Sequence, residues 1–310
     1  MRARAASIQS REGSSARGAL QAVSRFTWRR PRLVTLGQVS APVAAFLLVY
    51  VAALVALLIQ SLWTSDAFTG EIVHSWTLDN FREIADDPYP TIIRRTVFIA
   101  SAVTVTCMLL AFPYAYFLVR IASRRLRIVL LVATVLPLWV SYLVRVYSWR
   151  LILNPDGALN WWLNKLGLPD QNIAYTNWAM WLVFTYIWFP FMVLPVYAAL
   201  ERVPYSFIEA SADLGAKPIT TFLRVTLPLS VPGIVAGSLL VFIPAVGEYV
   251  IPSLLGRTDQ LMIGRVLSDE FFANRDCPVA SAVAICMLVL LIVPIMLFQH
   301  FQSRALEKRA

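Results

Sequence analysis

Six long segments without a charged side chain divide this 310-residue chain, and they constrain its fold more than any other feature. A helix needs about 20 apolar residues to cross the hydrocarbon core of a bilayer, with a working range of roughly 17–25. Five of the segments exceed that length. The third is the shortest, and its helix can extend past residue 144 if the Arg145 side chain snorkels to the membrane interface. The segments without Asp, Glu, Lys or Arg are 33–65, 96–119, 128–144, 171–200, 225–247 and 277–303.

The segments predict an all-α membrane protein, because a soluble domain of this length would not be 58% hydrophobic and only 15% charged. We expect residues 36–303 to form one membrane domain between a basic, disordered tail at 1–35 and a short tail at 304–310. The first apolar segment is too long for a signal peptide, so we interpret it as an uncleaved anchor. The six transmembrane helices are expected near 42–63, 96–118, 128–148, 178–200, 229–251 and 279–301.

Basic residues gather in alternate loops, and this sets the expected orientation. The N-terminal tail, the loop after the second span, the central loop at 201–230 and the C-terminal tail carry most of the arginines and lysines. Since positive loops stay in the cytoplasm, we expect both termini and the central loop to be cytoplasmic. The net charge of +9 is therefore a topology signal, and no nucleic-acid partner is expected.

The central loop carries helix signals of its own. Ser206-x-x-Glu209 fits a capping box, which predicts a helix running to about Leu214. Gly215 suits a left-handed C-terminal position, and Pro218 suits the first turn of a second helix. The loop is thus expected to form a helix–glycine–helix hairpin. A capping role for Glu209 does not exclude its contact with a partner.

The fifth segment is interrupted by prolines and glycines, so we expect it to lie inside the bundle beside a cavity. Gly233 and Gly237 form a small-xxx-small face for close helix packing. Glu248 ends the uncharged part of this segment in the outer half of the membrane. Two interpretations stay open for it: a carboxylate reached by water at the headgroups, or a cation site on a transport route.

An amphipathic element follows the third segment. After the turn signal at 154–157, Leu159, Trp162, Leu163 and Leu166 recur at helical spacing. This helix can lie in the outer headgroup region, where it either fills space against membrane lipid or contacts an extracytoplasmic partner. The sequence leaves both possibilities open.

The chain offers no set of residues for covalent chemistry. Gly13 and Gly18 have the spacing of a phosphate-binding loop, but Ala19 and Leu20 replace the required Lys-Ser/Thr. Its two histidines fall on opposite sides in the expected topology, and its three cysteines have no metal-ligand spacing. We therefore expect no catalytic residue, no metal and no cofactor, and an external source of energy for any transport.

The central loop resembles a known motif. Glu209-Ala210-Ser211 with Gly215, followed after nine residues by Val-x-Leu-Pro, is similar to the EAA loop of ABC importer permeases, with mild departures at Ser211 and Val225. The resemblance implies a type I importer permease fold, a cytoplasmic ATPase dimer that grips the loop, and a second homologous permease subunit. It also implies that the ATPase-coupling residues are Glu209, Ala210, Ser211, Asp213 and Gly215.

A wider resemblance to polyamine permeases covers about residues 40–300. It rests on Tyr142–Arg145, Gly247–Gly256 and Met262–Asp276, and the Gly-Glu-Tyr-Val-Ile-Pro segment is most similar to putrescine permeases. It implies a non-catalytic, multi-pass subunit of the bacterial inner membrane that receives putrescine or a related polyamine from a periplasmic binding protein. Glu248 and Tyr249 are then the hypothetical substrate-pathway residues.

Two alternatives remain. One is an ABC importer permease for another small solute, since Cys277 stands where polyamine permeases commonly have tryptophan. The other is an ion-coupled secondary transporter, which would need coupling carboxylates in several spans. Only Glu248 qualifies as such a carboxylate.

Overall fold

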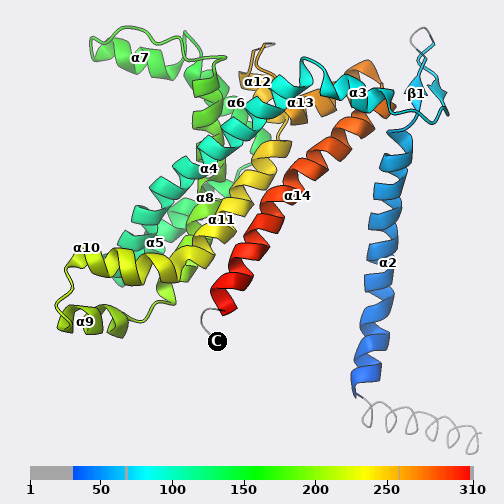
Figure 1. The fold of residues 1–310 in the computed structure, drawn as a ribbon. Helices are drawn as coiled ribbons and strands as arrows, with labels where there is room; N and C mark the ends of the chain where they lie inside the picture. Colours follow the sequence, from blue (N-terminus) through cyan, green and yellow to red (C-terminus); the bar gives the residue numbers. More distant parts are fainter. Residues whose placement is uncertain (1–30, 67–68, 258, 308–310) are drawn as a thin grey trace, which may run out of the picture. The chain divides into compact units, whose positions relative to one another are not determined.

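A computed structural model describes residues 31–66, 69–257 and 259–307 of the chain (Figure 1). It divides into two compact units, Met1–Leu57 and Leu58–Ala310, each of which is described by itself. Most of the predicted basic tail, residues 1–30, and the last residues of the predicted C-terminal tail, 308–310, lie outside the described residues. Residues 31–35 of the predicted tail are the first turn of a helix.

The described part of the first unit is a single apolar helix. Helix α2 (Pro31–Gln60) starts in this unit, and its stretch Pro42–Gln60 is long and apolar enough to cross a membrane. Large side chains such as Phe46 and Leu48 are each 70% exposed. A helix with so much apolar exposed surface is suited to a bilayer, where lipid can cover it.

The second unit is built almost wholly from helices. Its first half runs through a small antiparallel ribbon and then through the helices α3 to α7, which are joined by short turns (Figure 1). The elements of this half are β1 (Thr64–Ser65), β2 (Ile72–Val73), α3 (Asp79–Ala85), α4 (Tyr89–Arg120), α5 (Arg124–Val135), the 3-10 helix η1 (Leu136–Trp139), α6 (Tyr142–Leu153) and α7 (Ala158–Lys165).

The second half of this unit contains a helical path of 30 residues that runs without a gap through three elements, from Pro218 to Gly247. This half includes two short π-helices, η2 and η3, which are rare and often mark functional segments. The elements are α8 (Asn177–Glu201), α9 (Tyr205–Asp213), α10 (Pro218–Thr221), η2 (Phe222–Thr226), α11 (Leu227–Gly247), α12 (Val250–Leu255), α13 (Ile263–Ser268), η3 (Asp269–Asn274) and α14 (Cys277–Glu307).

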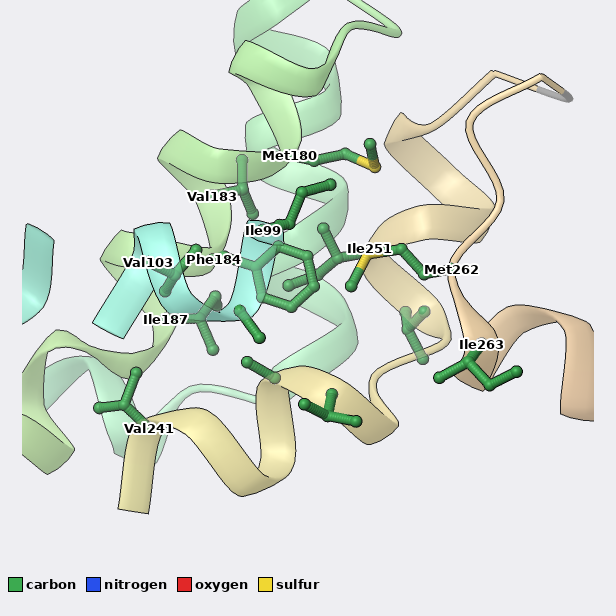
Figure 2. Packing of buried hydrophobic residues seen from close by; sticks show 14 of the residues in the cluster. Ile99, Val103, Met180, Val183, Phe184, Ile187, Val241, Ile251, Met262 and Ile263 are labelled. Carbon is green, nitrogen blue, oxygen red and sulfur yellow. The ribbon is translucent and has the colours of Figure 1, made fainter. Parts of the chain in front are cut away.

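The core of the second unit lies where α4, α8 and α11 pack together. Figure 2 shows Phe184 of α8 among Ile99 and Val103 of α4 and Ile251 of α12. The predicted glycine packing is confirmed, because a Cβ on Gly233 would come within 2.3 Å of the Ala199 Cβ atom in α8. These small residues let α11 approach α8 closely, as helices do where van der Waals contact drives association in a membrane.

Among the described residues, five helices are long and apolar enough to span a membrane, and a bent pair of helices gives a sixth span if it is counted as one. The third predicted span, near 128–148, is not one continuous helix. The chain forms α5 and η1, then turns by 96° into α6 and α7. Val140 and Ser141 have extended ψ angles of 138° and 136°, so the helical hydrogen bonds stop there.

The fifth span also differs from the prediction of 229–251. Its helical path runs without a gap from Pro218 to Gly247 and stops before Glu248. Much of the predicted loop at 201–230 therefore belongs to this helix. Pro232 and Pro244 lie within it, so the interruption falls at Glu248 and Tyr249 and not at the prolines.

Candidate functional site

The predicted helix–glycine–helix hairpin is present, but it does not begin as expected. Helix α9 starts at Tyr205, after Pro204, and no side chain caps it. Ser206 therefore lies inside the first turn, and the capping box with Glu209 was wrong. The reason is local: Pro204 is extended, with φ −61° and ψ 140°, and its carbonyl already accepts the first turn bond from the Phe207 N–H.

The glycine at the other end of α9 has the predicted role. Gly215 has φ +77°, and a Cβ added there would meet no atom within 4 Å, so backbone conformation alone favours glycine. Its N–H donates to the Ala212 carbonyl at 2.8 Å, and the Ala216 N–H donates to the Ser211 carbonyl at 3.1 Å. This pair of bonds is a Schellman motif, which closes the helix firmly. Pro218 then begins α10, as predicted.

The hairpin presents a mixed polar and apolar surface. Among the predicted coupling residues, Glu209, Ala210, Asp213 and Gly215 are exposed, and Ser211 is partly buried against α10. Large apolar side chains beside them were not predicted as part of the site. They lie outside the core, and exposed apolar groups of this kind are suited to anchor an interface. These exposed side chains are Tyr205, Phe207, Leu214 (88% exposed), Ile219 and Leu223.

Glu248 lies at the opposite end of the helix that starts at Pro218. It occupies the break between α11 and α12 with φ −72° and ψ 130°. Its Oε1 atom accepts a hydrogen bond from the Val250 N–H at 2.9 Å. The carboxylate therefore satisfies a backbone donor that the break would otherwise leave without a partner. Tyr249, next to it, is 49% exposed.

The backbone around Glu248 is tightly enclosed by Gly264 of α13. A Cβ at Gly264 would lie 2.6 Å from the Gly247 carbonyl oxygen and 2.7 Å from that of Glu248. Arg265, the next residue, donates to the Pro252 carbonyl of α12 at 3.0 Å. The break thus has a defined shape, held between α12 and α13.

Two polar side chains of α6 face the same region. The Glu248 carboxylate and the Arg145 guanidinium both act electrostatically on the Tyr142 hydroxyl, and Arg145 lies 5.8 Å from the centre of the Tyr142 ring. No hydrogen bond of standard geometry reaches the buried Tyr142 hydroxyl or the Arg145 Nε among the described residues. The sequence analysis connected neither residue with Glu248, because only the fold brings α6 against α12.

A groove of about 760 Å³ lies away from Glu248, between α4, α5, η1, α6 and α8. Its lining is mostly apolar and includes no carboxylate. Several of its hydroxyls already bond within the protein: Tyr114 to Thr134 at 2.8 Å and Thr185 to the Trp181 carbonyl at 2.7 Å. The groove is therefore less suited to a cation than the surroundings of Glu248.

Within the described part of the chain, no group of three His, Cys, Asp or Glu side chains is placed to hold a metal ion. Cys107, Cys277 and Cys286 are free thiols. The features that stand out are a hairpin with exposed apolar side chains and a carboxylate at the far end of the helix that begins at Pro218.

Comparison with known proteins agrees with this arrangement. Residues 108–308 match the family of binding-protein-dependent transport system inner membrane components. This chain belongs to that family. It is a multi-pass inner-membrane permease subunit of an ABC importer, and the family is one of transport components rather than of enzymes.

Individual relatives extend the match over most of the chain. The inner membrane ABC transporter permease protein YdcU of Escherichia coli is 38% identical over 90% of this chain and 93% of its own length. The spermidine/putrescine transport system permease protein PotB of Escherichia coli is 35% identical, covering 76% of this chain and 85% of PotB.

Among solved structures, a bacterial alginate ABC transporter in complex with its periplasmic protein contains a chain with the same fold. The TM-score is 0.70 at 18% identity, with 90% of this chain and 98% of that chain covered. This likeness shows the fold of a type I importer permease and nothing about the cargo.

Proposed function

We propose that this permease forms half of the translocation pathway for putrescine or a related polyamine. The observation that carries the proposal is the carboxylate of Glu248 in a helix break at the end of a membrane span. The names of PotB and its counterparts, which are spermidine/putrescine permeases, support the same class of cargo. YdcU, which is more similar in identity, has a name that gives no cargo.

The chemistry of the cargo fits the residues at the break. A diamine carries two positive charges at neutral pH and must shed water to pass. Glu248 offers a carboxylate, and the exposed ring of Tyr249 offers a cation–π contact of about 0.5–2 kcal/mol. A carboxylate near the membrane centre costs about 2.5–3.5 kcal/mol, less toward the interface, and a cationic cargo offsets that cost.

The α9–α10 hairpin is, in this proposal, the docking element for a cytoplasmic ATPase dimer. Glu209, Ala210, Ser211, Asp213 and Gly215 supply the polar part of the contact and its turn. The exposed Leu214 and Phe207 supply apolar anchors. ATP binding closes the ATPase dimer and opens the pathway outward, a periplasmic polyamine-binding protein releases its cargo, and ATP hydrolysis resets the pathway. A second homologous permease forms the other half, and membrane lipid surrounds both.

The proposed orientation places the hairpin and both termini in the cytoplasm. The distribution of arginine and lysine supports it. Figure 1 shows the hairpin and the end of α14 at one end of the second unit, with α7 and α12 at the other end. Labelling of a cysteine placed at Glu209, in a background without the three native thiols, tests the orientation directly. Labelling from the periplasmic side would contradict it.

The decisive experiment uses the whole complex, with both permeases and the ATPase in proteoliposomes and the binding protein outside. Radiolabelled putrescine uptake and ATP hydrolysis are measured for Glu248→Gln and for Asp156→Asn, an exposed acid of an outer loop that serves as the control. Loss of one charge-assisted contact is expected to lower uptake by Glu248→Gln about tenfold, with ATP hydrolysis retained. Unchanged uptake would remove Glu248 from the pathway.

The same assay tests the nature of the cargo. ATP hydrolysis should rise when the binding protein carries putrescine or spermidine. If no polyamine stimulates it, the importer carries another small solute. Uptake that follows an ion gradient without ATP would instead indicate a secondary transporter.

A further inference from the structure

One side-chain hydrogen bond joins the two helices of the hairpin. The Ser211 Oγ atom of α9 lies 2.5 Å from the Thr221 Oγ1 atom of α10. Thr221 is only 6% exposed, so this bond is sheltered from competing water. Between the two helices the chain turns at Gly215. The left-handed conformation of this residue sets the direction in which the chain leaves α9, but glycine has no side chain to contact α10.

Thr221 belongs to a long continuous helix. Helices α10, η2 and α11 follow one another without a gap from Pro218 to Gly247, a span of 30 residues. At about 1.5 Å per residue, that path is about 45 Å long. The hydrogen bond thus joins α9 to the start of this helical path, and Glu248 lies directly beyond its other end. The path from Pro218 to Gly247 is called the rod below.

The rod is also tied to α4 next to the hydrogen bond. The Phe222 ring, adjacent to Thr221, lies edge-on to Phe112 at 5.5 Å and to Tyr116 at 6.0 Å. Phe222 begins the π-helix η2, where its carbonyl accepts from the Leu227 N–H across a wider turn. A displacement of α9 that reaches Thr221 therefore acts on α4 and α11 together.

We propose that the Ser211–Thr221 hydrogen bond is the joint through which the docking helix moves this rod and, with it, the Glu248 end of the pathway. Ser211 and Thr221 are positioning residues, since neither needs to touch cargo. The inference rests on the proposed docking of α9 to the ATPase. Without the bond, α9 keeps only the Gly215 turn and its packing against α10 and η2, and part of its displacement bends that turn and does not reach the helix from Pro218 to Gly247. Ser211 is also a position where the loop departs from the pattern that it resembles.

The test compares Thr221→Val, which keeps the shape and removes the hydroxyl, with Thr221→Ser, which keeps the hydroxyl. In the assembled complex in proteoliposomes, putrescine taken up per ATP hydrolysed is the readout, and co-purification of the ATPase is measured in parallel. Loss of one hydrogen bond is expected to lower uptake per ATP by about threefold to tenfold in Thr221→Val. Thr221→Ser should stay within about twofold of the unmodified chain.

A double-mutant cycle with Ser211→Ala decides whether the two hydroxyls act through one bond. If they do, the double variant loses no more uptake per ATP than Thr221→Val alone. Losses that multiply would overturn the proposal, as would an unchanged ratio in Thr221→Val. Failure of Thr221→Val to co-purify with the ATPase would also overturn it, because the bond would then serve docking.

The docking proposal has a separate readout. A cysteine at Asp213 in the otherwise cysteine-free chain should cross-link to the ATPase. Absence of that cross-link in the active complex would contradict docking itself, whatever the uptake ratio of the Thr221 variants. The two proposals can therefore fail independently.

Discussion

The helix from Pro218 to Gly247 has a turn before it and a break after it, and the two are built differently. At the near end, backbone bonds of the Schellman motif close α9, and Gly215 supplies the left-handed turn. At the far end, the chain breaks at Glu248 and Tyr249, and a side-chain carboxylate accepts the Val250 N–H at 2.9 Å. The Gly215 turn is closed by backbone bonds, with the Ser211–Thr221 bond beside it, whereas the break at Glu248 is closed by an ionisable side chain.

The difference shows what each end can do. Backbone bonds close the Gly215 turn itself, so the exposed side chains around it, unlike Ser211, have no part in closing it and are available for docking. At the far end, the carboxylate that closes the backbone is also the group that can bind a cation. In the proposed function, cargo that binds the Glu248 oxygens competes with the Val250 N–H, and a backbone donor in a membrane must find a partner. The proposal therefore couples cargo binding to the conformation of this break.

The largest expected effect comes from Gly264→Val, which attacks the far end. A Cβ there would meet the carbonyl oxygens of Gly247 and Glu248 at 2.6 Å and 2.7 Å. Both atoms are backbone, so the break itself must move. We expect uptake of putrescine by the assembled complex to fall by at least about tenfold, because overpacking of this kind costs about 1–3 kcal/mol or more.

Gly247→Ala is the matched control for this change. Its Cβ would meet nothing closer than the Met287 Cε atom at 4.0 Å, an ordinary contact, and it lies on a helix. Uptake should therefore remain close to normal. Equal losses in the two variants would mean that the shape of the break around Glu248 has no special importance.

A smaller effect is expected at the near end from Gly215→Ala. The space around Gly215 is open, so the cost is only that of placing a side chain at φ +77°, about 1 kcal/mol. That cost corresponds to about a fivefold weaker affinity for the ATPase, measured by titrating purified ATPase against the permease complex. Gly215→Asn, which tolerates the left-handed region better, should lose less. A stronger effect of Asn than of Ala would contradict the conformational explanation.

The sequence predicted the turn at Gly215 better than the break at Glu248. The long apolar helices and the left-handed Gly215 were predicted because a bilayer demands apolar length and a tight turn demands glycine. The break at Val140 and Ser141 was not predicted, because both residues lie inside an uncharged segment and are residue types that also occur within membrane helices. The position of Glu248 at a span end was predicted, but its bond to Val250 was not, because the helix was expected to continue to residue 251.

The contacts between elements distant in sequence could not be predicted at all. The bond between Ser211 and Thr221 depends on how the hairpin closes, and the approach of Tyr142 to Glu248 depends on how α6 meets α12. Proline positions gave a misleading signal in the fifth span. Pro232 and Pro244 lie inside the helix, and the interruption falls beyond them.

The smallest expected effect tests the group of acidic side chains on and beside α3 and η3. Burial, then the nearby carboxylates of Glu270 and Asp276, raises the pKa of Glu83 above its ordinary value of 4.5. A raised pKa means that folding favours the protonated acid, so its stabilising contribution is complete below pH 4.5 and is lost as pH rises through the higher folded-state pKa. At neutral pH the ionised carboxylate is therefore a cost. Glu83→Gln should slightly raise the Tm of the detergent-solubilised complex at pH 7, by an amount that vanishes toward pH 4. Glu71→Gln, which changes an exposed acid directly before β2, should not raise it. A lower Tm for Glu83→Gln at pH 7 would show instead that a cationic group balances these acids.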